Sequence, residues 1–380
     1  MKDFKNMNNK ILKVLIAGDY YMVPGLLKKI IVEYLGTELS KKLFFESVEF
    51  KYPEEEIALL PETIVPSGMS FSHYNFTEKK QKNRIENIDE YYGFLDDLKK
   101  YMIDTHILIV HGAAVPKYIL QMAKELKLIC VLRGGPKNID IKAARELGIK
   151  VVNTPGKTAR AVAESVLGGL LSLTRNIVSG SWTLQREGVW KPNYYRYDLC
   201  GIELKDRVLG LIGFGHIAKE LVVLLKGFKM KKILAFDPYK TKREIESLGA
   251  ESVELAQLLK ESNIISLHAR LTSSSKNILG KQEFEMMRKI PIVINMARGA
   301  LMDYGALTEA LRNKKISGAI LDVYGDAPFK EYRELLSMPN VICTPHVAGG
   351  SRETVMRASK MVAEEIRRFV LGLSLKNEIK

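Results

Sequence analysis

The chain has 380 residues, of which 46% are hydrophobic and 27% charged, so it is long enough for two domains and too apolar for a disordered protein. The sequence lacks a Cys-x-x-Cys pair, so no metal site is expected. It also lacks an apolar run of membrane-spanning length and the pattern of a secretory signal, and its three cysteines lie far apart, so a reducing cytoplasm is favoured. The net charge of +14 is spread without a run of five basic residues, which favours attraction of small anions over binding of nucleic acid or a membrane.

The first part of the chain alternates short apolar runs with amphipathic segments, which is typical of a small α/β domain. Residues 51–100 interrupt this alternation with scattered prolines and a polar run, and they are interpreted as an excursion from the domain. Strands are predicted near 13–18, 44–50, 106–110, 128–132 and 150–152, and helices near 24–34, 90–102, 117–125 and 142–147.

A long helical pattern over 158–177 opens the second part. It is apolar on all sides, and this predicts burial at an interface, since a surface helix keeps one polar side. Strands and helices then alternate up to residue 346, as expected for a parallel sheet. A final helix is predicted over 351–371.

A glycine turn follows the predicted strand 208–212 and leads into a helix. Gly213 permits the tight turn, Gly215 lets the backbone approach a pyrophosphate, and Ala218 lets the helix pack on the strand. The start of the helix directs unpaired N–H groups at the phosphates. The loop residues expected to bind a dinucleotide are Gly213, Gly215, His216, Ile217 and Ala218.

An acidic residue stands where a dinucleotide site requires one. Asp237 lies 19 residues after Ala218 and directly after the predicted strand 232–236, where a carboxylate binds the adenosine ribose hydroxyls. It would repel a 2′-phosphate, so NAD is favoured over NADP. Three basic residues that follow closely keep NADP open, namely Lys240, Lys242 and Arg243. A glycine turn and a capping aspartate in another α/β protein are the alternative interpretation.

Linked motifs over 105–372 extend this pattern. They read Arg-Gly-Gly-Pro-Lys-Asn-Ile-Asp at 133–140, Val-Asn-Thr-Pro-Gly at 152–156, Ile-Asn-Met-Ala-Arg-Gly at 294–299, Leu-Asp-Val-Tyr at 321–324 and Thr-Pro-His-Val-Ala-Gly at 344–349. Together with the glycine loop they resemble the D-isomer specific 2-hydroxyacid dehydrogenase family, which includes phosphoglycerate, glycerate and D-lactate dehydrogenases.

The resemblance implies an α/β fold of two Rossmann-like domains with doubly wound parallel sheets. A substrate domain, residues 1–155 and 347–380, would contain an inserted NAD-binding domain, residues 156–346, and the active site would lie in the cleft between them. The resemblance and the apolar helix over 158–177 also suggest a homodimer.

The family's catalytic groups fall on particular residues here. His346 is implied to be the general acid/base, since an imidazole titrates near neutrality. Arg298 is implied to bind the substrate carboxylate and polarise the reacting carbonyl, because a guanidinium matches a carboxylate in shape. The backbone N–H groups of Gly134 and Gly135 would hold the same carboxylate. A loop histidine, a surface ion pair and an ordinary turn remain the simpler interpretations.

The resemblance also implies contacts on the nicotinamide side of the cofactor. Asp322 would reach the carboxamide or, alternatively, only cap the end of a strand. His268 would position its neighbours or have no functional role. The residues expected to bind the cofactor are Gly213, Gly215, His216, Ile217, Ala218, Asp237, Met296, Ala297, Arg298, Asp322, His346 and Gly349.

Two departures from the family stand out. The family's third catalytic residue is a glutamate whose spacing leads to Ala327, and the adjacent Asp326 is the candidate replacement, because a carboxylate usually orients a basic imidazole. Otherwise water or another side chain holds His346. His111 stands where phosphoglycerate enzymes offer an arginine, which disfavours a phosphorylated substrate. No additional regulatory domain of the kind that many of those enzymes carry is expected.

The sequence therefore predicts an NAD-dependent oxidoreductase that acts on a small D-2-hydroxyacid or its 2-oxoacid, with His346, Arg298 and Asp326 as its catalytic residues. A protein that senses NAD without turnover, similar to the family's transcriptional corepressors, is the main alternative, and Ala327 is its best support. A basic nucleic-acid-binding protein is the third interpretation, and its binding would fall steeply with salt.

Overall fold

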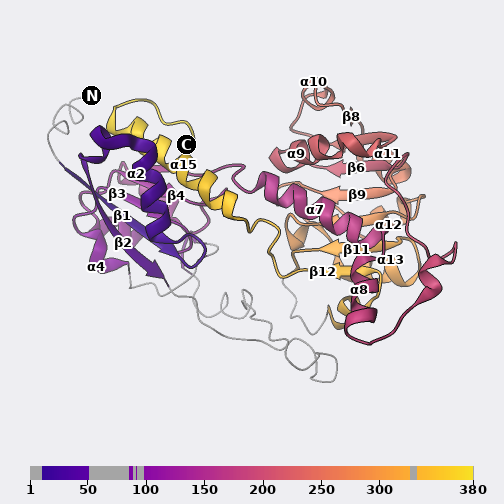
Figure 1. Ribbon diagram of the computed structural model, residues 1–380. Coiled ribbons are helices and arrows are strands. Elements are labelled where there is room, and N and C mark those ends of the chain that lie inside the picture. The colour runs from indigo at the N-terminus through magenta and orange to yellow at the C-terminus, as the bar shows by residue number, and fades with distance from the viewer. Residues whose placement is uncertain (1–10, 51–84, 89–90, 92–97, 326–331, 380) are drawn as a thin grey trace. The chain divides into compact units, whose positions relative to one another are not determined.

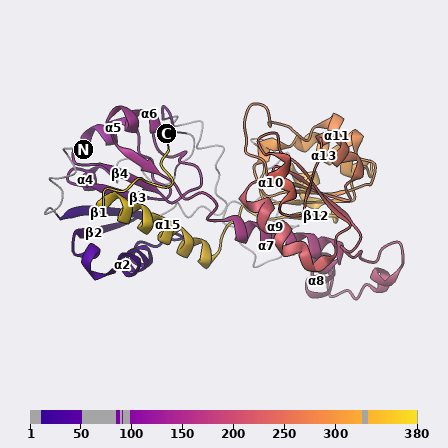
Figure 2. The same ribbon diagram turned by 90° about the horizontal axis from the view of Figure 1, so that it is seen from above.

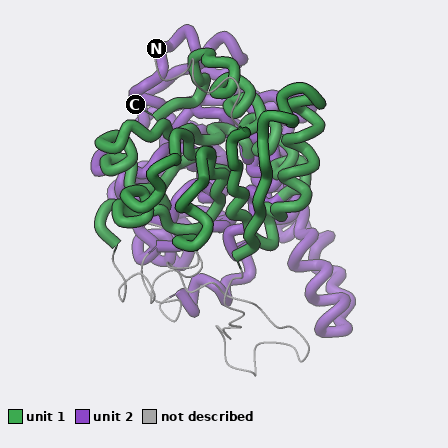
Figure 3. The backbone as a smooth tube through the Cα atoms, turned by 90° about the vertical axis from the view of Figure 1, so that its left-hand side faces the viewer, with its two compact units in different colours: residues 1–55, 74–157, 351–380 green, residues 56–73, 158–350 purple. Residues whose placement is uncertain are grey.

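The computed structural model describes residues 11–50, 85–88, 91, 98–325 and 332–379. They form two compact units, which Figure 3 colours separately. Unit 1 contains the described residues up to Lys157 and those from Ser351 onwards, and unit 2 runs from Thr158 to Gly350. The chain therefore leaves unit 1, completes unit 2 and returns to unit 1, with its divisions at 157/158 and 350/351.

Unit 1 is built on a parallel sheet of five strands in the order β2-β1-β3-β4-β5 (Figure 1). Strands β3 and β4 are buried along their whole length, as expected where helices cover both faces of a parallel sheet. The strands predicted from apolar runs are confirmed, with the bounds β1 (Leu12–Asp19), β2 (Leu43–Phe50), β3 (Ile107–Val110), β4 (Leu128–Val131) and β5 (Lys150–Val152).

The helices of unit 1 lie in two layers, one on each face of the sheet. Val14 and Ile16 point to the face covered by α2 and α15, whereas Leu15 and Ala17 point to the face of α4, α5 and α6 (Figure 2). The helix predicted over 90–102 and the excursion over 51–100 lie largely outside the described residues. The bounds are α2 (Pro24–Ser40), α4 (Lys99–Met102), α5 (Lys117–Met122), α6 (Ile141–Glu146) and α15 (Arg352–Val370).

Unit 2 contains a parallel sheet of seven strands in the order β12-β11-β10-β9-β6-β7-β8. Because every strand runs in the same direction, the loops after their carboxyl ends meet at one edge, and this edge carries most of the predicted site. The bounds are β6 (Val208–Ile212), β7 (Lys232–Phe236), β8 (Glu251–Ser252), β9 (Ile264–Leu267), β10 (Ile292–Asn295), β11 (Gly318–Leu321) and β12 (Val341–Cys343).

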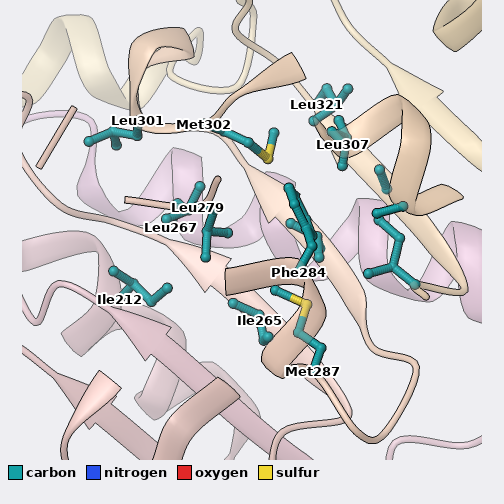
Figure 4. Close-up of a cluster of buried hydrophobic side chains, with 14 of the residues drawn as sticks. Ile212, Ile265, Leu267, Leu279, Phe284, Met287, Leu301, Met302, Leu307 and Leu321 are labelled. Atoms are coloured by element: carbon teal, nitrogen blue, oxygen red, sulfur yellow. The ribbon is translucent and has the colours of Figure 1, made fainter. Parts of the chain in front are cut away.

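Two apolar layers hold this second sheet. Helices α7 and α9 pack on one face, and α11, α12, α13 and α14 pack on the other, where Phe284 and Leu307 meet the strands (Figure 4). No helix within the described ranges combines the length and apolar character needed to cross a membrane. The bounds are α7 (Ala159–Thr174), α9 (His216–Leu225), α10 (Lys242–Glu246), α11 (Leu255–Glu261), α12 (Lys281–Met286), α13 (Tyr304–Arg312) and α14 (Arg333–Ser337).

The single helix predicted over 158–177 is wrong at its C-terminal end. Helix α7 stops at Thr174, and Asn176 adopts a left-handed conformation with φ of 55°, after which α8 (Ile177–Gln185) begins. Asparagine tolerates this conformation better than most residues, so it divides an apolar stretch that periodicity alone would continue. Helix α7 buries one side against the sheet of unit 2, rather than its whole circumference.

Candidate active site

The glycine loop joins β6 to α9 in a conformation that only glycine permits. Gly213 has φ of 93°, and a Cβ atom there would lie 2.5 Å from the backbone nitrogen of Ala269. Its N–H donates to the carbonyl of Phe236 at 2.8 Å, which ties the turn to the end of β7. The turn is therefore fixed by the strands on both sides.

The start of α9 is open to a ligand. A Cβ atom at Gly215 would meet nothing within 4 Å, and buried Ala218 lets the helix pack closely on the sheet. No described residue accepts a hydrogen bond from the backbone N–H groups of Gly215, His216 or Ile217. Free N–H groups at a helix N-terminus attract phosphate oxygens, so this loop fits the pyrophosphate of a dinucleotide.

Asp237 lies at the end of β7 beside the glycine loop. One carboxylate oxygen accepts the N–H of Phe214 at 2.7 Å, and the other accepts the N–H of Tyr239 at 2.9 Å. These bonds hold the half-buried carboxylate at the rim of the loop, where it still has acceptor capacity for ribose hydroxyls.

Two of the three basic residues near Asp237 have acidic partners on α10. Lys240 Nζ lies 2.8 Å from Glu244 Oε1, and Lys242 Nζ lies 3.7 Å from Glu246 Oε1. The hydrogen bonds from Lys240 and Thr241 lower the pKa of Glu244 to about 2, while Glu244 raises that of Lys240. These pairs reduce the positive charge available to a 2′-phosphate.

Arg298 follows β10 in a loop that a buried asparagine organises. The side chain of Asn295 accepts the N–H of Ala297 at 3.1 Å and donates to the carbonyl of Arg298 at 3.0 Å. A Cβ atom at Gly299 would collide with the carbonyl oxygen of Tyr324, so this loop fits closely against the segment after β11. Arg298 is exposed, and its guanidinium donates to the carbonyl of Ala297 at 2.7 Å.

The loop of His346 follows β12 and is held by Asp322, which is only 1% exposed. One Asp322 oxygen accepts from Thr344 Oγ1 at 2.6 Å and from the N–H of Val347 at 2.8 Å, and the other accepts the N–H of Ala348 at 3.0 Å. The imidazole-bearing residue between these anchors is exposed and has φ of 57°. Asp322 thus fixes the backbone on both sides of His346.

His268 follows β9, between the glycine loop and the Arg298 loop in the strand order. Its Nε2 lies 2.9 Å from Ser266 Oγ, and its buried Nδ1 has no hydrogen-bond partner among the described residues. Burial lowers the pKa of the imidazole to about 4, so His268 is neutral near pH 7. His268 therefore carries no charge to the site.

Three of the remaining predicted residues lie in the loops after β10 and β12, two lie in unit 1 and one lies outside the described residues. Met296 and Ala297 are buried at the end of β10, and Gly349 packs against Thr158. Gly134 and Gly135 are exposed in unit 1, where a Cβ atom at either would meet nothing within 4 Å. Asp326 and Ala327 lie outside the described residues.

Sequence reasoning missed the contributions of Asn295 and Thr344. Both organise the loops that carry Arg298 and His346, and both are polar residues at the carboxyl ends of strands, since Asn295 ends β10 and Thr344 follows β12. That position alone signals a strand-end residue of some kind, whereas the partner it binds depends on the neighbouring strand.

Comparison with known proteins agrees with this geometry. The family model described as "D-isomer specific 2-hydroxyacid dehydrogenase, NAD binding domain" matches residues 167–348. A hydroxypyruvate reductase of Thermotoga maritima is 38% identical over 274 residues, which cover 71% of this chain and 87% of that protein. The chain belongs to the D-isomer specific 2-hydroxyacid dehydrogenase family.

Other members of the 2-hydroxyacid dehydrogenase family are similar over comparable lengths. A D-3-phosphoglycerate dehydrogenase of Methanocaldococcus jannaschii is 37% identical over 286 residues, covering 75% of this chain and 53% of its own length. The chain thus spans about half the length of the phosphoglycerate dehydrogenases that it matches. A solved D-lactate dehydrogenase of Escherichia coli aligns over 97% of this chain and 100% of its own, with a TM-score of 0.69 and 26% identity. Unit 2 contains all of the residues that the family model matches.

Proposed function

We propose that this protein transfers a hydride between NAD and C2 of a small D-2-hydroxyacid or 2-oxoacid. The observation that carries the proposal is the carboxyl edge of the unit 2 sheet. There the neighbouring strands β10, β11 and β12 bring together the Arg298 loop, Asp322 and the His346 loop. NAD, when bound, supplies or accepts the hydride, and the glycine loop with Asp237 would hold it.

The proposed roles of the chain's own residues concern charge and protons. The Arg298 guanidinium binds the substrate carboxylate and polarises the C2 oxygen, with the N–H groups of Gly134 and Gly135 as further donors. His346 gives a proton to the C2 oxygen in reduction and removes it in oxidation. Asp322 acts as a positioning residue, because its hydrogen bonds fix the loop that carries the imidazole.

Further parts of the proposal concern the domains and the compartment. Unit 1 is proposed to be the substrate domain, since it carries Gly134 and Gly135, and Asp326 is proposed as the partner of His346. The cysteines Cys130, Cys200 and Cys343 are free, in keeping with the proposed cytoplasmic location.

A homodimer is also proposed, with α8 and the segment after it as the contact surface. Large apolar side chains are unusually exposed there, and they include Trp190 at 77%, Tyr195 at 93% and Tyr197 at 97%. Within unit 2 this segment extends away from the sheet (Figure 2). Exposed apolar patches of this kind favour contact with a second protein surface.

A screen of 2-oxoacids with NADH, followed by the absorbance of NADH, tests the activity. Oxidation of NADH that depends on one or more 2-oxoacids is the expected result. Tight NADH binding without turnover of any 2-oxoacid would contradict the proposed enzymatic function. It would favour a protein that senses NAD, since a sensor requires binding alone.

A further inference from the structure

The carboxyl edge of the unit 1 sheet gathers four ionisable side chains. Asp19 ends β1, His111 follows β3, Arg133 follows β4 and Lys157 follows β5. The strand order β2-β1-β3-β4-β5 reverses between β1 and β3, and open parallel sheets bind their ligands at such a reversal, beyond the carboxyl ends of the strands. The four side chains therefore stand where this fold binds small molecules.

Asp19 is the negative member of this cluster and is engaged within unit 1. It is 2% exposed, and one oxygen accepts the N–H groups of Tyr21 and Met22 at 3.0 and 2.8 Å. Its other oxygen lies 2.5 Å from His111 Nδ1. Asp19 thus orients the imidazole of His111 through Nδ1.

Lys157 is the unusual member, because it is a lysine with only 7% of its surface exposed. Its carbonyl accepts from Arg357 Nε at 2.8 Å, whereas no described residue forms a hydrogen bond or ion pair with its ammonium group. The charges that act on this ammonium are those of Arg133, which repels it, and of Asp19, which attracts it. A buried cation without a direct partner is costly, and a bound anion would provide that partner.

The charges of the cluster indicate what kind of anion would fit. Burial and repulsion by Arg133 lower the pKa of Lys157 to about 7, and burial, opposed by Asp19, lowers the pKa of His111. A bound anion favours the protonated form of Lys157. With Lys157 protonated, Arg133 and Lys157 carry two positive charges against the one negative charge of Asp19, an excess that matches a single carboxylate and is smaller than the charge of a phosphate dianion.

We propose that Lys157, with His111 and Arg133 beside it, binds a second carboxylate of the substrate, so that the substrates are 2-oxoacids and D-2-hydroxyacids with an acidic group at the far end of the carbon chain. This inference rests on the proposed oxidoreductase function. It names Lys157 as a specificity-determining residue and places the cation that His111 does not provide on the loop after β5.

Pairs of 2-oxoacids with equal numbers of carbon atoms test the proposal. Oxaloacetate, 2-oxoglutarate and 2-oxoadipate are compared with 2-oxobutanoate, 2-oxopentanoate and 2-oxohexanoate, and kcat/KM is measured with NADH. A preference of about 10-fold or more for the dicarboxylate is expected at one length at least, the scale of a hydrogen bond between charged groups. Equal or better use of the monocarboxylate at every length overturns the proposal.

The Lys157→Met variant should reduce this preference by about 10- to 100-fold, and Lys157→Arg, which keeps a cation, should retain much of it. Lys142→Met is the matched control, since Lys142 is an exposed lysine on α6 of the same unit, and it should leave the preference unaltered. Circular dichroism verifies folding of each variant. An unchanged preference in folded Lys157→Met overturns the assignment.

Binding without turnover separates the two proposals. Calorimetric titration of the NAD⁺-saturated protein with the same pairs measures affinity in complexes that cannot react. Preferred binding of the dicarboxylates without any turnover would reject the dehydrogenase function while supporting the carboxylate site. The same titration compares 3-phosphohydroxypyruvate with hydroxypyruvate. If this preference for the phosphorylated compound exceeds the preference for every dicarboxylate over its monocarboxylate partner, the proposed carboxylate site is overturned in favour of a phosphate site.

Discussion

At the scale of single residues, Asp237 decides between the two nicotinamide cofactors. Its carboxylate is fixed at the rim of the glycine loop, and like-charge repulsion from a 2′-phosphate should disfavour NADPH by at least about 1.4 kcal/mol, or tenfold. Fluorescence titration measures the affinities for NADH and NADPH. Asp237→Ala should reduce the difference between the two affinities. It should also lower the affinity for NADH, because the N–H of Phe214 loses its acceptor. Equal affinities in the native protein would contradict this role.

The roles proposed for His346 and Arg298 predict different kinetic effects. His346→Ala should leave the affinity for NADH nearly intact and lower kcat by about 100-fold or more, the usual loss for a general acid/base. Arg298→Ala should also raise KM, because the guanidinium binds the carboxylate of the ground state. Steady-state kinetics with the best 2-oxoacid separates these effects, and full activity of the His346 variant would exclude it as the proton donor.

The missing glutamate makes the pH profile informative. Reduction of a 2-oxoacid requires the protonated imidazolium, so its rate falls as the pH rises through the pKa of His346. A carboxylate beside the ring raises that pKa. Ala327→Glu should therefore move the falling limb to higher pH, by about one unit.

Asp326 offers the complementary test. If Asp326 already acts as the partner, Asp326→Asn should move the same limb to lower pH, and Ala327→Glu should change little. The logarithm of kcat/KM plotted against pH distinguishes the two outcomes. A profile that neither substitution moves would show that another group holds His346.

At the scale of elements, two adjacent glycines in α7 differ in what surrounds them. A Cβ atom at Gly168 would meet nothing within 4 Å, whereas one at Gly169 would lie 2.8 Å from Cγ2 of buried Ile320 on β11. Gly168→Ala should raise the free energy of unfolding by about 0.5–1 kcal/mol, because alanine favours a helix interior.

Gly169→Ala should instead lower the free energy of unfolding by about 1–3 kcal/mol, because the added methyl group would force α7 away from β11. Urea denaturation measures both changes, and each variant is the control for the other. An equal gain in the two variants would show that α7 does not pack as closely on β11 as the structure indicates.

The same elements show which features local sequence predicts. The apolar runs of β1, β3 and β6 and the glycine turn after β6 depend on neighbouring residues, and the sequence predicted them with bounds near those observed. The end of α7 was missed because a left-handed asparagine leaves no trace in the apolar pattern. The bonds of Asp322 to the His346 loop join residues 22 to 26 positions apart, so only the pairing of β11 with β12 reveals them.

The cluster around Lys157 also could not be predicted from the sequence. Its members lie at or after the carboxyl ends of four strands, and although His111 stood out in the sequence, nothing there placed Asp19, Arg133 and Lys157 beside it. The strand order of unit 1 brings them to one edge, and the burial of Lys157 then distinguishes it from the exposed lysines of the chain.

At the scale of the whole molecule, the apolar surface of α8 and the segment after it predicts self-association. Sedimentation velocity should show a dimer at micromolar concentration. Trp190→Ser should shift the population towards the monomer, since it removes a large exposed aromatic side chain from the proposed interface. Phe44→Ser is a control, because Phe44 is also exposed, at 59%, but lies on the edge strand β2 of unit 1. A monomeric native protein would contradict the dimer.

The return of α15 to unit 1 has a consequence for the order of events during synthesis. Val355, Val362 and Ile366 of this helix complete the apolar core formed by β1, β3 and α2, although unit 2 separates them in the chain. A ribosome therefore releases all of unit 2 before unit 1 can close its core. Until then α2 alone covers this face of the N-terminal sheet, so a nascent chain halted before residue 352 should expose the part that α15 covers to chaperones even after unit 2 has folded.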